Sequence, residues 1–167
     1  EDHYYALVSK KNAPHRNDIV DLAAFLRKRV DYFGLLAEVK NIRIELESEA
    51  LCAIEIASTD LQRIIDNTIS NAIKYSFENT TIRISLKKNS KITLRVTNQG
   101  STIINPHYIF TDGYRESYDT VGMGVGLEIV ASICQRQHIR AKVESSEGTT
   151  TFTYTFQGKT DNENHIA

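Results

Sequence analysis

Residues 67–76 read Asn67-Thr68-Ile69-Ser70-Asn71-Ala72-Ile73-Lys74-Tyr75-Ser76, inside a longer segment with helical periodicity. The segment starts at Ser58-Thr59-Asp60, which is typical of a helix start, and its pattern predicts a helix to about Tyr75. At about 3.6 residues per turn, Asn67, Asn71 and Lys74 fall within an arc of roughly 60°. The apolar positions expected to face a sheet lie on the other side: Leu61, Ile65, Ile69 and Ala72.

The polar arc has two interpretations. An asparagine carbonyl is a neutral oxygen ligand that suits Mg²⁺, and a lysine supplies a point positive charge for phosphate. The alternative is an amphipathic helix with a solvated polar face. Asparagine is a poor helix former, however, so two asparagines on one exposed face gain nothing from propensity.

A glycine run, Gly122-Met123-Gly124-Val125-Gly126-Leu127, precedes a second helix that we predict over Glu128–Gln137. A glycine-rich loop that enters a helix is suited to anions, because free N–H groups and the helix dipole point outward. The run is weak evidence alone. Combined with the asparagine helix, it indicates a nucleotide site that is neither a P-loop nor a Rossmann crevice.

Composition sets the protein class. The chain has 167 residues, of which 41% are hydrophobic and 25% charged, as expected for one globular domain. A net charge of −1 does not support nucleic-acid binding. Cys52 and Cys134 stand in apolar contexts and indicate buried free thiols in a reducing compartment. We therefore expect a cytoplasmic protein or the cytoplasmic part of a membrane protein.

The remaining pattern predicts a mixed sheet with helices packed on one face. A helix over Leu22–Val39, capped by Asp18 or Asp21, comes first. A strand pair, Ile42–Glu47 and Ala53–Ile56, precedes the asparagine helix. The later strands are expected at Thr81–Lys87, Lys91–Thr97, Ile139–Glu144 and Thr149–Phe156. Residues 1–17 read as a linker and residues 158–167 as a disordered tail.

Three motifs together resemble those of bacterial sensor histidine kinases. Residues 67–76 resemble their N box, Gly122–Leu127 their G2 box, and Ile109-Phe110 with Tyr114-Arg115 their F box. Order and spacing also agree, and the resemblance covers roughly residues 18–157. It implies a two-layer α/β sandwich of the Bergerat type, with a mostly antiparallel sheet. Gyrase, MutL and a heat-shock chaperone share that ATP-binding fold.

The resemblance also implies the cofactors ATP and Mg²⁺, and it assigns site residues. Asn71 would bind the metal with Asn67 assisting, and Arg115 would reach the γ-phosphate. The residues expected along the phosphates or ribose are Lys74, Tyr75, Gly122, Gly124, Gly126 and Leu127. The linker, residues 1–17, would be the end of a dimerisation helix.

Asn67 distinguishes two chemistries within the superfamily. Relatives that hydrolyse ATP have a glutamate general base four residues before the metal-binding asparagine, and Asn67 cannot accept a proton there. The resemblance thus implies a kinase that transfers the γ-phosphoryl to a histidine. His3 and His15 lack the following acidic residue of the family's acceptor. The acceptor would lie on a dimerisation domain outside this chain, in a homodimer that signals to a response regulator receiver domain.

The G1 box departs from the family pattern. Asn98 stands where the family has an aspartate that accepts a hydrogen bond from adenine, Gly100 is retained, and Thr102 replaces a glycine. An uncharged acceptor makes a weaker hydrogen bond, so we expect weaker ATP binding. Two alternatives follow. One is a binding-deficient domain that serves as a protein-interaction module, and the other, disfavoured by Asn67, is a gyrase- or MutL-like ATPase.

Overall fold

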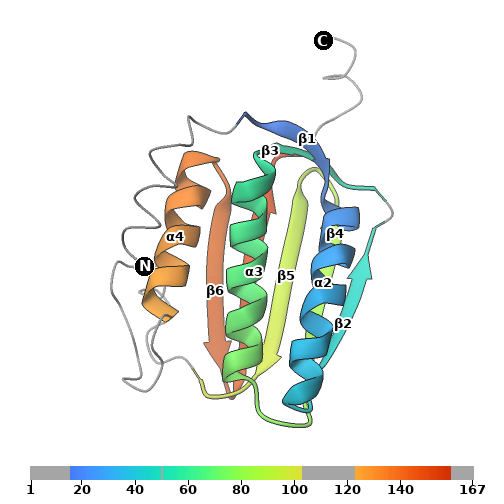
Figure 1. The fold of residues 1–167 in the computed structure, drawn as a ribbon. Coiled ribbons are helices and arrows are strands. Elements are labelled where there is room, and N and C mark those ends of the chain that lie inside the picture. Colours follow the sequence, from blue (N-terminus) through green and yellow to red (C-terminus); the bar gives the residue numbers. More distant parts are fainter. Residues whose placement is uncertain (1–15, 50, 103–122, 159–167) are drawn as a thin grey trace, which may run out of the picture.

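The structure, a computed structural model, describes residues 16–49, 51–102 and 123–158. Within these ranges the chain forms two layers, with helices on one face of a five-stranded sheet (Figure 1). The helices are α2 (Leu22–Val39), α3 (Ser58–Tyr75) and α4 (Met123–Arg136). The predicted α/β sandwich is confirmed.

The main sheet is mixed and mostly antiparallel, as predicted. Its strand order is β2-β4-β5-β7-β6, and only the β2–β4 pair is parallel. The strands are β2 (Arg43–Ser48), β4 (Thr81–Lys88), β5 (Ile92–Gln99), β6 (Arg140–Ser146) and β7 (Thr149–Phe156). Each lies within two residues of its predicted bounds where a prediction exists.

A second, two-stranded sheet corrects the prediction for the first part of the chain. Strand β3 (Ala53–Ile56) pairs with β1 (Asp18–Asp21), so β2 and β3 are not partners. The alternation in each segment indicated a strand but carried no information on its neighbour. Strand β1 was missed because its four residues are too few for a periodic signal. Asp21 caps α2, since its carboxylate accepts a hydrogen bond from the Ala23 N–H at 3.1 Å.

Helix α4 begins five residues earlier than predicted, at Met123 rather than Glu128. Glycine disfavours helices, which placed the predicted start after the glycine run. Gly124 and Gly126 are instead helical. Burial of Leu127, Val130 and Ile133 stabilises the helix despite its glycines.

The core lies between the helices and the sheet, where α3 contributes the central apolar stripe. The inward-facing side chains of the strands pack toward this stripe, as Ile92, Leu94 and Val96 of β5 do. Tyr154 of β7 is completely buried, which raises the pKa of its hydroxyl. Both cysteines are buried free thiols, as predicted, and burial raises the pKa of each.

A buried pair of hydroxyl groups joins α3 to the sheet. The Thr68 hydroxyl lies 2.7 Å from the Tyr154 hydroxyl and also donates to the Ile64 carbonyl oxygen at 2.7 Å.

Thr68→Val leaves the Tyr154 hydroxyl buried without this partner and is expected to lower the free energy of unfolding by about 1–3 kcal/mol. Tyr154→Phe, the matched control, leaves Thr68 bonded to Ile64 and is expected to cost about 1 kcal/mol. Urea unfolding measures both, and an equal or reversed ranking would contradict the assignment.

Candidate nucleotide-binding site

The described residues of the predicted site meet at one edge of the two layers. The carboxyl ends of α3 and β5, the amino end of α4 and the turn between β6 and β7 all lie at this edge (Figure 1). Helix α3 contacts α4 on one side and β5 on the other. It presents Asn67, Asn71 and Tyr75 one turn apart along its length.

At the α4 side, Gly126 meets Asn67. A Cβ atom added to Gly126 would lie 2.6 Å from Oδ1 of Asn67, which is too close for any real contact. Nδ2 of Asn67 donates to the Arg63 carbonyl oxygen of its own helix at 2.7 Å. The predicted phosphate helix is therefore seated directly on the asparagine helix through a glycine.

Asn71 lies in the middle of this face and is half-buried. Its Nδ2 atom is buried and makes no hydrogen bond with the part of the chain that the structure describes. An unsatisfied buried donor costs about 1–3 kcal/mol, so it needs a reason such as a ligand. A half-turn of the amide exchanges nitrogen and oxygen, and the position can thus present a donor or a metal ligand.

At the β5 side, Gly100 meets the end of α3. A Cβ atom on Gly100 would lie 2.0 Å from the Tyr75 carbonyl oxygen, and Gly100 forms an isolated bridge with Ser76. Asn98 is buried, with 5% of its surface exposed, and continues the inward row of Ile92, Leu94 and Val96. The apolar face of β5 therefore ends in an amide beside Gly100, where the sequence placed adenine recognition.

Thr150 was missed by the sequence analysis. It lies opposite Asn98 on β7 and is 4% exposed, and its hydroxyl is 2.8 Å from that of Ser145. Directly opposite residues of paired strands point to the same face, so this hydroxyl adds a second polar group beside Asn98. The alternation of β7 could have indicated it, because Thr150 shares the inward positions with Phe152 and Tyr154.

Two lysines lie near the carboxyl end of α3. Lys74 is exposed, and its Nζ lies 5.7 Å from the centroid of the Tyr75 ring. Lys40, which follows α2, donates to the carbonyl oxygens of Ile73 and Lys74 at 2.8 and 3.0 Å. A cation stabilises the negative end of a helix dipole. Lys40 lies 34 residues from Lys74 in the sequence, so no local pattern indicated this contact.

The remaining predicted site features fall into two groups, those outside the described residues and those on α4. Arg115, Gly122 and the F box lie outside the described residues. Leu127 is fully buried in the core, so only its backbone is available to a nucleotide. Gly124 lies in the first turn of α4.

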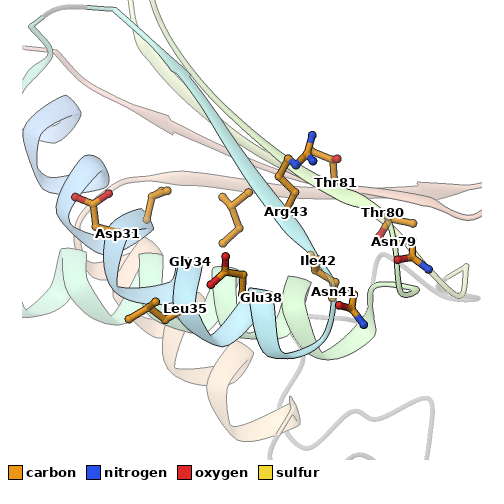
Figure 2. A pocket seen from close by; sticks show the side chains of 12 residues that line it. Asp31, Gly34, Leu35, Glu38, Asn41, Ile42, Arg43, Asn79, Thr80 and Thr81 are labelled. Atoms are coloured by element: carbon orange, nitrogen blue, oxygen red, sulfur yellow. The ribbon is translucent and has the colours of Figure 1, made fainter.

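A separate groove of about 870 Å³ lies between α2, β2 and the start of β4 (Figure 2). None of the predicted nucleotide residues lines it. Its charged lining residues are Asp31 and Glu38 of α2 and Arg43 of β2. The groove and the nucleotide edge are therefore different places on the molecule.

The arrangement agrees with a comparison of the sequence with protein families. A family model described as histidine kinase-, DNA gyrase B-, and HSP90-like ATPase matches residues 56–160. The chain belongs to this family. The description of its members as ATPases implies that the chain binds ATP.

Similar curated proteins include a probable sensor protein and a sensor histidine kinase. The probable sensor protein PcoS of Escherichia coli is 37% identical over 121 residues, which are 68% of this chain and 26% of PcoS. The sensor histidine kinase HprS, also of Escherichia coli, is 31% identical over 137 residues, 79% of this chain and 30% of HprS. The chain thus spans less than a third of the length of these relatives.

Solved structures show the same fold. The catalytic domain of the histidine kinase ThkA, in a nucleotide-free form, has a TM-score of 0.76 at 21% identity, with 84% of this chain and 95% of that chain covered. The mycobacterial sensor histidine kinase MprB has a TM-score of 0.76 at 20% identity, with 86% and 98% covered. Among the helices that the structure describes, none is long and apolar enough to cross a membrane.

The contact between Gly100 and Tyr75 predicts opposite results for two glycine substitutions. Gly100→Ala forces the ends of β5 and α3 apart and is expected to destabilise the domain by about 1–3 kcal/mol. Gly34→Ala is the matched control, because a Cβ atom there meets nothing within 4 Å in the middle of α2. It is expected to stabilise by about 0.5–1 kcal/mol through helix propensity. Thermal unfolding compares the stability of the two variants. Unchanged stability of Gly100→Ala would show that β5 and α3 can move apart at this contact at little cost.

Proposed function

We propose that the chain is the ATP-binding catalytic domain of a two-component sensor histidine kinase, which transfers the γ-phosphoryl of ATP to a histidine outside this chain. One observation carries the proposal most directly. The half-buried Asn71 presents an unsatisfied amide midway between two glycine contacts, one to α4 and one to β5. That spacing suits a nucleotide with adenine at the β5 end and phosphates at the α4 end.

The residues present fit Mg²⁺ together with ATP. Mg²⁺ usually takes one or two protein oxygens and completes its shell with phosphate oxygens and water. The Asn71 side chain would supply such an oxygen, and the metal would neutralise charge on the phosphates. Lys74, exposed on the same side of α3, would add a positive charge near them. Free N–H groups at the start of α4 would donate hydrogen bonds to a phosphate oxygen.

The adenine end is provided by β5 and β7. Asn98 would accept a hydrogen bond from the adenine amino group, with the Thr150 hydroxyl beside it. Gly100 keeps the backbone close to α3, and Tyr75 forms part of the wall between adenine and the core. Each of these groups binds or orients the nucleotide, and none of them moves a proton.

Transfer rather than hydrolysis follows from Asn67. An amide does not abstract a proton from water at neutral pH, so this position lacks a general base. Phosphoryl transfer depends mainly on positioning and charge stabilisation, which the site can provide. The acceptor would be a histidine on a dimerisation domain that precedes residues 1–17, and a receiver domain would take the phosphoryl group next. Arg115 as a γ-phosphate ligand stays a prediction.

Asn71→Ala tests the metal-binding role. We expect Mg²⁺-dependent binding of a non-hydrolysable ATP analogue to fall at least about tenfold, since the variant loses a metal ligand. Thermal stability without nucleotide should stay equal or rise, because the unsatisfied amide is removed. Calorimetric titration measures affinity. Asn89→Ala is the matched control, because Asn89 is exposed in the β4–β5 turn at the far end of β5.

Two results would oppose the proposal. The first is wild-type protein that binds no nucleotide at millimolar ligand with Mg²⁺. The second is Asn71→Ala protein that binds as well as wild type. Labelling of an acid-labile phosphohistidine on an added dimerisation domain tests the transfer itself, and release of free phosphate without labelling would favour hydrolysis instead.

Asn98→Asp tests the adenine end. A charged acceptor forms a hydrogen bond roughly twice as strong as a neutral one, so affinity for the ATP analogue is expected to rise about fivefold. The free protein should lose stability, because a carboxylate would be buried at a position only 5% exposed. Affinity and thermal unfolding are measured on one preparation. A weaker affinity would place adenine away from Asn98.

A further inference from the structure

Near its amino end, helix α4 contacts the side chain of Asn67 on α3. The three heavy atoms nearest to a Cβ atom placed on Gly126 all belong to Asn67: Oδ1 at 2.6 Å, Cγ at 3.3 Å and Cβ at 3.8 Å. Alanine at residue 126 therefore requires Asn67 or α4 to move. The separation of the two helices at this point is set by the size of Asn67 against a residue with no side chain.

The Asn67 side chain is held in place by its own helix. Its Nδ2 donates to the Arg63 carbonyl oxygen at 2.7 Å, one turn earlier. This hydrogen bond fixes the plane of the amide and turns Oδ1 toward Gly126. Because a Cβ atom on Gly126 would lie 2.6 Å from this oxygen, Oδ1 lies directly beside the backbone of α4.

A second attachment lies at the other end of α4. The buried carboxylate of Asp60 accepts hydrogen bonds from Arg136 and Gln137, each at 2.9 Å. Asp60 and Asn67 are seven residues apart, about two turns, on the same side of α3. Helix α4 is thus attached to α3 at two points, and its amino end extends just beyond the contact between Gly126 and Asn67.

We propose that Asn67 is a positioning residue, which seats Gly126 and so sets where the amino end of α4 lies relative to Asn71. It does not serve as a second Mg²⁺ ligand. The proposal rests on the proposed function, because the distance that it sets is the one between the phosphate and metal contacts. A change of that distance alters nucleotide affinity with or without Mg²⁺, whereas loss of a metal ligand alters only Mg²⁺-dependent binding.

A double-mutant cycle tests this role with Asn67→Ala, Gly126→Ala and the double variant. Affinity for the ATP analogue is measured by calorimetry in Mg²⁺ and again in EDTA. Gly126→Ala is expected to weaken binding about tenfold in both conditions. The double variant should recover most of this loss, because the new methyl group occupies space that the asparagine vacates. Gly34→Ala controls for a glycine substitution in a helix.

The outcomes separate the two roles. A double variant that binds no better than Gly126→Ala, or an Asn67→Ala variant that loses affinity only with Mg²⁺, overturns the proposal. If Gly126→Ala does not fold, folding of the double variant is the expected rescue, and its failure also overturns the proposal. If the wild type binds no nucleotide, the proposed function fails alone. In that case the same double-mutant cycle is measured in the free energy of unfolding. Zero coupling between the two substitutions would count against the proposed contact between Asn67 and Gly126.

Discussion

Two close backbone approaches to helix α3 organise this domain. Gly126 brings α4 against Asn67, and Gly100 brings the end of β5 against the Tyr75 carbonyl group. Neither approach tolerates even a methyl group without displacement. Because both contacts lie on the helix that carries Asn71, the proposed phosphate end and the proposed adenine end of the site are both positioned relative to α3. The rest of the core holds that helix on the sheet.

The site is built where the core gives up apolar contacts. The inward rows of β5 and β7 end in Asn98 and Thr150, and the α3 face above them carries the unsatisfied amide of Asn71. An apolar residue at each position would add burial, at roughly 25 cal/mol per Å². Local stability is thus expected to be lower at this edge than in the core, and a nucleotide bound at the proposed site would interact with these polar groups.

Much of the fold could be predicted because periodicity is local. The bounds of α2 and α3 match the sequence prediction, since each has an uninterrupted apolar stripe. The start of α4 was wrong because propensity counts glycine against a helix, whereas packing of Leu127 and Val130 decides. The β1–β3 pair was missed because strand neighbours are set by tertiary contacts.

In the candidate site, too, local motifs could be predicted from the sequence, whereas contacts set by tertiary packing could not. The motifs predicted five of the described site residues, and their roles stay predictions: Asn67, Asn71, Tyr75, Asn98 and Gly100. The structure places the first three along α3 and the last two at the carboxyl end of β5, where Gly100 meets Tyr75. The motif did not reveal that Asn67 faces Gly126 and donates to its own helix, since both depend on helix–helix packing. Lys40 and Thr150 act across 33 and 52 residues, beyond any local signal.

The hydrogen bonds of Asp60 to Arg136 and Gln137 also connect α4 with the segment before β1. Gln137, which donates to Asp60, also exchanges two hydrogen bonds of 3.0 Å with the amide of Asn17, just before β1. The segment that leads into the domain is therefore fastened to one end of α4, and the glycines occupy the other end. The 14 residues of α4 form a rod of about 21 Å. A displacement of Asn17 would therefore act first on the carboxyl end of α4, which is the end opposite the glycines.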